Sequence, residues 1–171
     1  GVSFSRFHAD ELGLDWKETY LALLNDLGVK SFRFSAHWPL VEPEMDKYNF
    51  AELDFQMAEA KKNGASVVLA VGRRLPGWPE CHEPEWFKNQ ISKISAEGGS
   101  ASGGKNPAPP ERGSPSQTWR QNEFESFKQE RILKYVETVV NRYKYYENII
   151  YWQVENEPFL TYFSRSACGP L

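Results

Sequence analysis

The sequence has 171 residues, of which 40% are hydrophobic and 15% aromatic, so it is long enough to bury one sizeable core. Its formal net charge of −3 at pH 7 argues against the basic patch or stripe that marks nucleic-acid-binding proteins. No apolar run approaches the roughly 18 residues of a membrane-spanning helix, and no signal peptide is visible.

Four short apolar segments predict β-strands at residues 2–5, 31–35, 66–71 and 148–154. The third segment is almost continuously apolar, which is typical of a strand buried on both faces of a parallel sheet. Helical patterns lie between the strands, at about residues 16–27, 50–62 and 122–143. This alternation predicts an α/β fold with right-handed crossovers and a parallel sheet.

The first predicted helix carries the clearest boundary signals. Asp15 precedes it and Glu18 occupies its third position, which resembles a capping box. Gly28 is expected to end it, because glycine adopts positive φ readily. Apolar side chains recur along it at helical spacing, at Trp16, Tyr20, Leu23, Leu24 and Leu27.

Residues 95–118 are rich in Gly, Ser and Pro and poor in apolar side chains. Such a segment cannot bury enough apolar surface to order itself. We therefore predict a disordered surface insertion at 95–118, within a single domain that spans residues 1–171.

Polar and aromatic side chains follow three of the predicted strands. His37, Trp38 and Glu42 follow the second strand, residues 72–82 (Gly-Arg-Arg-Leu-Pro-Gly-Trp-Pro-Glu-Cys-His) follow the third, and Asn156 and Glu157 follow the fourth. Active sites of parallel α/β folds gather at the carboxyl ends of the strands, so we expect the site there. Cys81 and Cys168 follow adjacent strands, and a disulfide between them is a hypothesis.

The segment Asn156-Glu157-Pro158 resembles the signature that closes the fourth strand in a large clan of retaining glycosidases built on TIM (β/α)8 barrels. That clan contains cellulases, mannanases and β-galactosidases. Arg33 matches an arginine that these enzymes carry on the second strand, and residues 75–82 resemble the third loop of bacterial cellulase-like hydrolases. The resemblance spans nearly the whole chain apart from the insertion. It implies the first four (β/α) units of a TIM barrel, as the amino-terminal half of a glycosidase that acts on β-linked glycans.

The resemblance implies a role for each matching residue. Glu157 is expected to be the general acid that protonates the leaving oxygen and then the base that activates water. Asn156 is expected to bind the sugar 2-hydroxyl, and Arg33 to orient the nucleophile and keep it ionised. Lower-ranked substrate-binding candidates are Trp38 and Trp78, which would stack on sugars, and His37, Arg73 and His82, which would bind hydroxyls. Core packing or loop bracing is the alternative for each of these five.

One geometric constraint and one departure from the clan shape these expectations. Strict alternation along a strand sends Asn156 and Glu157 to opposite faces, so the strand end must be twisted or bulged for both to reach a ligand. A retaining mechanism also needs a nucleophilic carboxylate, which arrives on the clan's seventh strand. We therefore expect the chain to be a fragment that hydrolyses nothing alone, and we expect no metal or organic cofactor.

Two other functions stay open at this point. The chain is alternatively a non-catalytic carbohydrate-binding domain, or a half-barrel that self-associates into a homo-oligomer through its open sheet edges. The expected partner is an oligo- or polysaccharide rather than a nucleic acid. The compartment is unassigned, although polysaccharide hydrolysis favours a location outside the cytoplasm.

Overall fold

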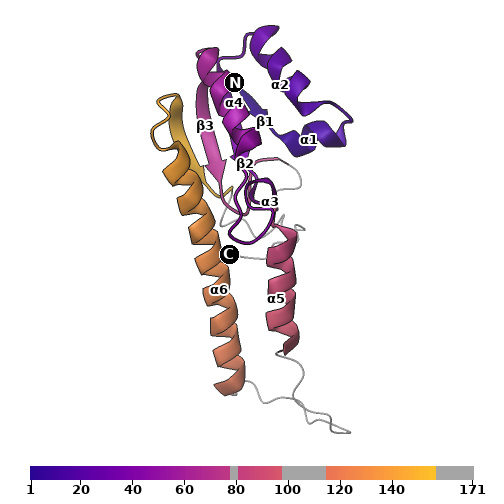
Figure 1. The fold of residues 1–171 in the computed structure, drawn as a ribbon, viewed down its shortest axis with the longest axis vertical. Helices are drawn as coiled ribbons and strands as arrows, with labels where there is room; N and C mark the ends of the chain where they lie inside the picture. Colours follow the sequence, from indigo (N-terminus) through magenta and orange to yellow (C-terminus); the bar gives the residue numbers. More distant parts are fainter. Residues whose placement is uncertain (78–80, 98–114, 157–171) are drawn as a thin grey trace.

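The computed structural model describes residues 1–77, 81–97 and 115–156 of the chain. Four strands form one parallel sheet in the order β1-β2-β3-β4 (Figure 1). Their bounds are Val2–Phe4 (β1), Ser31–Ala36 (β2), Ser66–Val71 (β3) and Ile149–Val154 (β4). The predicted strands are confirmed to within one residue at each end. Sequential parallel strands joined by helices are the arrangement of the first half of a TIM barrel, as predicted.

The helices connect the strands in order along the chain. Their bounds are Arg6–Glu11 (α1), Trp16–Asn25 (α2), Trp38–Val41 (α3), Ala51–Lys62 (α4), Glu85–Glu97 (α5) and Pro115–Tyr143 (α6). The predicted start of α2 is confirmed, because the Asp15 carboxylate accepts hydrogen bonds from the backbone N–H groups of Lys17 and Glu18 at 2.8 and 2.9 Å. None of the helices among the described residues has the length and apolar character to cross a bilayer.

The predicted insertion at 95–118 is too long at both ends. Residues 95–97 belong to α5, and residues 115–118 belong to α6. Pro115 begins α6, where a residue that lacks a backbone N–H costs nothing because the first helical N–H groups have no partner inside the helix. Residues 98–114 lie outside the described part of the chain.

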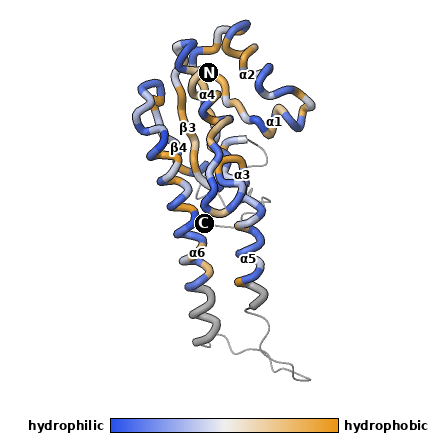
Figure 2. Tube along the Cα trace, viewed as in Figure 1, coloured by the Kyte–Doolittle hydropathy of each residue, from blue (hydrophilic) through white to orange (hydrophobic). Residues whose placement is uncertain are grey.

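One face of the sheet carries the hydrophobic core. Phe32 and Phe34 on β2 pair in register with Val67 and Leu69 on β3, and all four side chains are at most 1% exposed. Tyr20 of α2 packs against both phenylalanine rings at 5.4 Å between ring centroids. The buried core also includes residues of α4 and α6, namely Leu53, Met57, Ala60, Tyr135, Val139 and Tyr143. Figure 2 shows β3 as a hydrophobic stretch at the centre of this arrangement.

The opposite face of the sheet carries small and polar side chains near the carboxyl ends of its strands. Alternation along β2 directs Arg33 and Ser35 to this face, away from Phe32 and Phe34. Ser35 pairs with Ala70, which in turn pairs with Gln153 of β4. In a closed barrel this face lines the interior, where sites form at the carboxyl ends of the strands.

Candidate active site

The predicted site loops all begin at one edge of the sheet. The last residues of the three strands, Ala36, Val71 and Val154, are neighbours in the sheet register. The segments that follow them therefore start side by side, as expected for the carboxyl end of a parallel sheet.

Arg33 lies on the inner face and lines a cavity. Its side chain is partly buried, and its Nε donates a hydrogen bond to Ser3 Oγ at 2.9 Å. The cavity has a volume of about 250 Å3 and is lined by Ser3, Phe4, Ser5, His8, Arg33, Ser35, Pro76 and Gly77. Three hydroxyls, an imidazole and a guanidinium in one hollow can bind a polyhydroxylated ligand through hydrogen bonds.

Several of these lining residues were missed from the sequence. Ser35 stands two residues after Arg33 on β2, and Ser3 is the register partner of Arg33 on β1, so strand alternation and pairing could have found both. His8 carried no such signal, because α1 spans only six residues and was not predicted.

The end of β4 turns sharply at Glu155, which has a φ of 61°. Its carboxylate accepts hydrogen bonds from the backbone N–H groups of Arg73 and Arg74, at 2.7 and 2.8 Å. This left-handed residue breaks the strict alternation of the strand, as the sequence required if Asn156 and Glu157 are both to reach a ligand.

Asn156 is held at the same edge by its backbone and its side chain. Its N–H donates to the carbonyl of Arg74 at 2.9 Å, and its Oδ1 accepts from Gln153 Nε2 at 3.1 Å. Gln153 shares its row of the sheet with Ser35, so the amide of Asn156 lies on the inner face with Arg33.

The predicted acid/base Glu157 and the predicted stacking residue Trp78 lie outside the described residues. Cys168 does as well, whereas Cys81 is disulfide-bonded, which the hypothesis of a bridge requires. In the described ranges, no group of three or more His, Cys, Asp or Glu side chains is arranged to hold a metal ion.

His37 and His82 form a compact aromatic group with Phe7. The three ring centroids are 4.6–4.7 Å apart, and the histidines are only 5% and 8% exposed. Burial, together with the nearby charges of His82 and Arg6, lowers the pKa of His37 well below its ordinary value, so this imidazole is neutral at pH 7. This packing corresponds to the loop-bracing alternative for both histidines.

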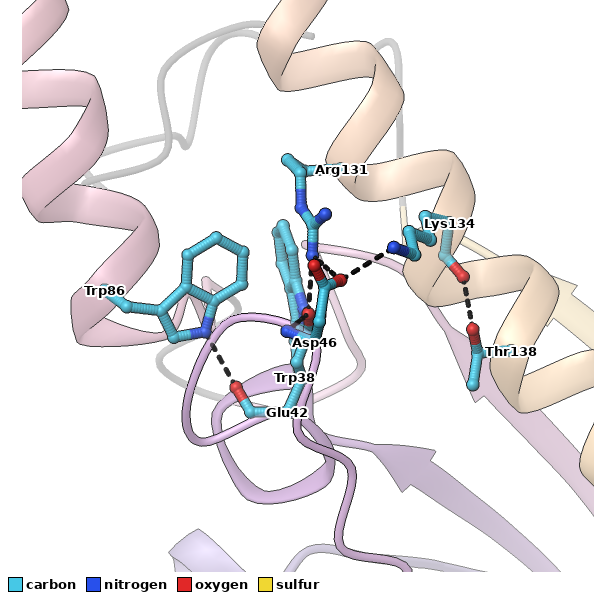
Figure 3. Close-up of polar contacts among 7 residues, drawn as sticks. All are labelled: Trp38, Glu42, Asp46, Trp86, Arg131, Lys134 and Thr138. Carbon is cyan, nitrogen blue, oxygen red and sulfur yellow. Dashed lines mark hydrogen bonds and ion pairs between the residues drawn. The ribbon is translucent and has the colours of Figure 1, made fainter.

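Trp38 does not fit the predicted stacking role, because its side chain is 0% exposed and offers no face to a sugar. Its ring packs on Phe87 and Tyr135, with centroids at 4.7 and 5.2 Å. Its Nε1 donates to Glu42 Oε2 at 2.7 Å (Figure 3). The core-packing alternative therefore holds for Trp38.

The structure buries Arg73, which was predicted to bind sugar hydroxyls. The residue is 2% exposed, and its Nε donates to Glu83 Oε1 at 2.8 Å, within the loop that follows β3. This buried ion pair with Glu83 corresponds to the loop-bracing alternative for Arg73.

Comparison with known proteins agrees with this architecture. The family model of glycoside hydrolase 42, described as β-galactosidase, matches residues 12–169. No curated protein matches the chain with significance.

Two solved structures illustrate the structural likeness. A polyextremophilic β-galactosidase from the Antarctic haloarchaeon Halorubrum lacusprofundi matches with a TM-score of 0.52 and 22% identity, over 92% of this chain and 21% of that one. A family 39 glycoside hydrolase from the gut symbiont Bacteroides cellulosilyticus WH2 matches with a TM-score of 0.37 and 17% identity, over 84% of this chain and 22% of that one. The first match supports the fold, and the chain spans about a fifth of the length of either structure.

Proposed function

Since the chain belongs to the β-galactosidase family glycoside hydrolase 42, we propose that it is the amino-terminal half of the catalytic barrel of a retaining glycosidase. The substrates are β-linked glycans, and β-galactosides are the first to test. Glu157 acts as general acid and then general base, Asn156 binds the sugar 2-hydroxyl, and Arg33 orients and ionises the nucleophile.

One observation carries this proposal. Arg33 lines a cavity of about 250 Å3 on the inner face of the sheet, and the amide of Asn156 binds Gln153, which shares its row of that same face with Ser35. A neutral hydrogen-bonding group and a cation on one face are what the two binding roles need: one for a sugar hydroxyl, the other for a carboxylate.

The nucleophile comes from a part of the protein outside this chain. It must lie about 5–5.5 Å from the acid/base carboxylate in a retaining enzyme. The described carboxylates near this edge already have structural partners: Glu42 binds Arg131 and Trp38, Glu83 binds Arg73, and Glu155 binds two backbone N–H groups. We therefore expect the purified 171-residue chain not to hydrolyse β-galactosides.

The test uses the full-length protein, with Glu157→Gln as the variant and two substrates that differ in leaving group. Loss of the general acid is expected to lower kcat/KM by about 100- to 10,000-fold for an alkyl β-galactoside. The loss should be smaller for a nitrophenyl β-galactoside, because nitrophenolate departs without a proton.

Glu147→Gln is the matched control, since Glu147 is an exposed carboxylate in the turn before β4, and it is expected to behave as wild type. Equal activity of Glu157→Gln and Glu147→Gln would refute the role of Glu157. Turnover by the isolated chain that Glu157→Gln abolishes would refute the need for an outside nucleophile.

A further inference from the structure

Glu155 combines a left-handed backbone, a hydrogen bond that continues the strand pairing, and a carboxylate that binds the neighbouring loop. It has a φ of 61°, which non-glycine residues rarely adopt and which recurs at functional sites. Its backbone N–H still donates to the Val71 carbonyl at 2.9 Å, so the strand pairing continues up to this residue. Its carboxylate then turns back on the β3 loop and binds the N–H groups of Arg73 and Arg74, one with each oxygen.

Gly72 makes room for this carboxylate. A Cβ built at Gly72 would lie 2.5 Å from Glu155 Oε1 and 2.6 Å from its carboxyl carbon, closer than real Cβ atoms come. The φ of Gly72 is 140°, which also favours glycine. The glycine directly after β3 and the glutamate directly after β4 therefore form one matched arrangement.

This arrangement determines how Asn156 is presented. The residue directly after the left-handed turn is Asn156, whose N–H donates to the Arg74 carbonyl at 2.9 Å. The same short loop, residues 73–74, thus anchors the Glu155 carboxylate and the Asn156 backbone. With the backbone fixed there, the Asn156 amide meets Gln153 on the inner face at 3.1 Å.

We propose that Glu155 is a positioning residue of the active site: its carboxylate, seated over Gly72 and held by the Arg73 and Arg74 N–H groups, fixes the left-handed turn that aims the Asn156 amide at the sugar 2-hydroxyl. This inference rests on the proposed glycosidase function. Glu155 acts through Asn156 and does not itself touch the substrate.

The experiment measures how strongly the full-length enzyme uses the 2-hydroxyl. The readout is kcat/KM for a nitrophenyl β-galactoside divided by kcat/KM for its 2-deoxy analogue, compared among variants so that the intrinsic reactivity of the two substrates cancels. Asn156→Ala sets the value expected when the contact is lost. Glu155→Gln and Glu155→Gly are expected to lower the ratio by about 10- to 100-fold, toward that value, because a misaimed amide loses a contact that strengthens in the transition state.

The two substitutions separate shape from charge. Glu155→Gln keeps the volume but replaces one acceptor oxygen with an NH2 group, and Glu155→Gly tolerates the φ of 61° while deleting the carboxylate. Gly72→Ala should lower the ratio as well, by displacing the carboxylate. Glu147→Gln is the matched control and should leave the ratio unchanged.

Amide hydrogen exchange on the 171-residue chain supplies a second readout that does not depend on activity. The Arg73 and Arg74 amides are expected to exchange at least about tenfold faster in Glu155→Gly than in wild type, since each loses its acceptor. A wild-type substrate ratio in both Glu155 variants would overturn the positioning role, and so would unchanged exchange. If Asn156→Ala itself leaves the ratio unchanged, the proposed function fails at Asn156, and the exchange data alone then decide whether Glu155 anchors the turn.

Discussion

The Glu42 carboxylate is the most deeply buried acidic group described in this fold, with 0% exposure. It accepts hydrogen bonds from Trp38 Nε1, from the Asp46 backbone N–H and from Arg131, at 2.7, 2.8 and 2.7 Å. Trp86 Nε1 donates to the Glu42 carbonyl at 2.9 Å. The carboxylate thus joins the segment after β2 to helix α6, and the Glu42 carbonyl adds α5 through Trp86 (Figure 3).

Arg131→Met is expected to destabilise the chain by about 3 kcal/mol, because it leaves a buried carboxylate without its cation. The Trp38 and Asp46 donors still bind the Glu42 carboxylate in this variant. The expected loss of stability is therefore at the lower end of the range for broken buried ion pairs. Urea unfolding measures it. Lys134→Met is the control: Lys134 pairs with Asp46 at a half-exposed site, so its loss should cost less than about 1 kcal/mol. Equal effects of the two substitutions would contradict the structural role of the buried pair.

His37 should make stability depend on pH. Its pKa in the folded chain is lowered, chiefly by burial, whereas in the unfolded chain it is near about 6.5. Below that pH the His37 imidazole is protonated in the unfolded chain but stays neutral in the folded chain. The free energy of unfolding therefore decreases as pH falls, by up to about 1 kcal/mol per pH unit from this group.

The His37→Phe variant removes this contribution. We expect the free energy of urea unfolding to fall less between pH 7.5 and pH 5.5 in His37→Phe than in wild type. The comparison between the two proteins cancels the other titrating groups. The same pH dependence in both would mean that His37 titrates alike in the folded and unfolded chains.

At the scale of elements, the start of α2 depends on one side chain. Asp15→Ala is expected to cost about 1 kcal/mol of stability, since two backbone N–H groups lose their acceptor. Asp15→Asn should be nearly neutral, because asparagine caps helices about as well. Thermal or urea unfolding of the two variants checks the cap, and a larger loss in Asp15→Asn than in Asp15→Ala would contradict it.

The strands and helices α2, α4 and α6 were predictable because each carries a repeated local pattern. β3 is almost wholly apolar, and α2 and α4 end near glycines with positive φ, at Gly28 and Gly64. Helices α1 and α3 span six and four residues, too few for periodicity to appear. The unpredicted α5 did carry a signal, since Phe87, Ile91 and Ile94 recur at helical spacing.

The placement of candidate site residues was predictable only where residue type and strand position agreed. Arg33 and Asn156 were proposed from the sequence because a charged or amide side chain stands on or just after a strand, and their role at the sugar stays a prediction. Trp38 was misassigned, because position after a strand does not reveal whether a side chain turns outward or into the core. The hydrogen bonds from the Arg73 and Arg74 N–H groups to the Glu155 carboxylate join residues far apart in sequence, and no local pattern encodes them.

At the scale of the whole molecule, the described sheet has two open edges, at β1 and β4. β4 exposes Ile150, Tyr151 and Val154 by 51%, 68% and 60%. Unpaired strand edges with exposed apolar side chains attract other strands. We expect the isolated chain to self-associate, so that its apparent mass in size exclusion rises with concentration.

Ile150→Lys is expected to weaken this association, because a charge on an edge strand opposes pairing. Leu133→Lys is the control, since Leu133 is 67% exposed but lies on helix α6 and offers no strand backbone for pairing. A mass that is independent of concentration in the wild-type chain would show that the edges are protected in another way.

The central claim is that this chain supplies one half of a glycosidase site, with Asn156 and Arg33 at the sugar and the nucleophile elsewhere. The most direct test is a crystal structure of the full-length protein trapped with a 2-deoxy-2-fluoro-β-galactoside, in which fluorine replaces the 2-hydroxyl. The account predicts a sugar bonded covalently to a carboxylate outside residues 1–171, with its 2-position facing Asn156 and Arg33 beside the bonded carboxylate. A sugar bonded to a residue of this chain, or bound away from Asn156 and Arg33, would contradict it.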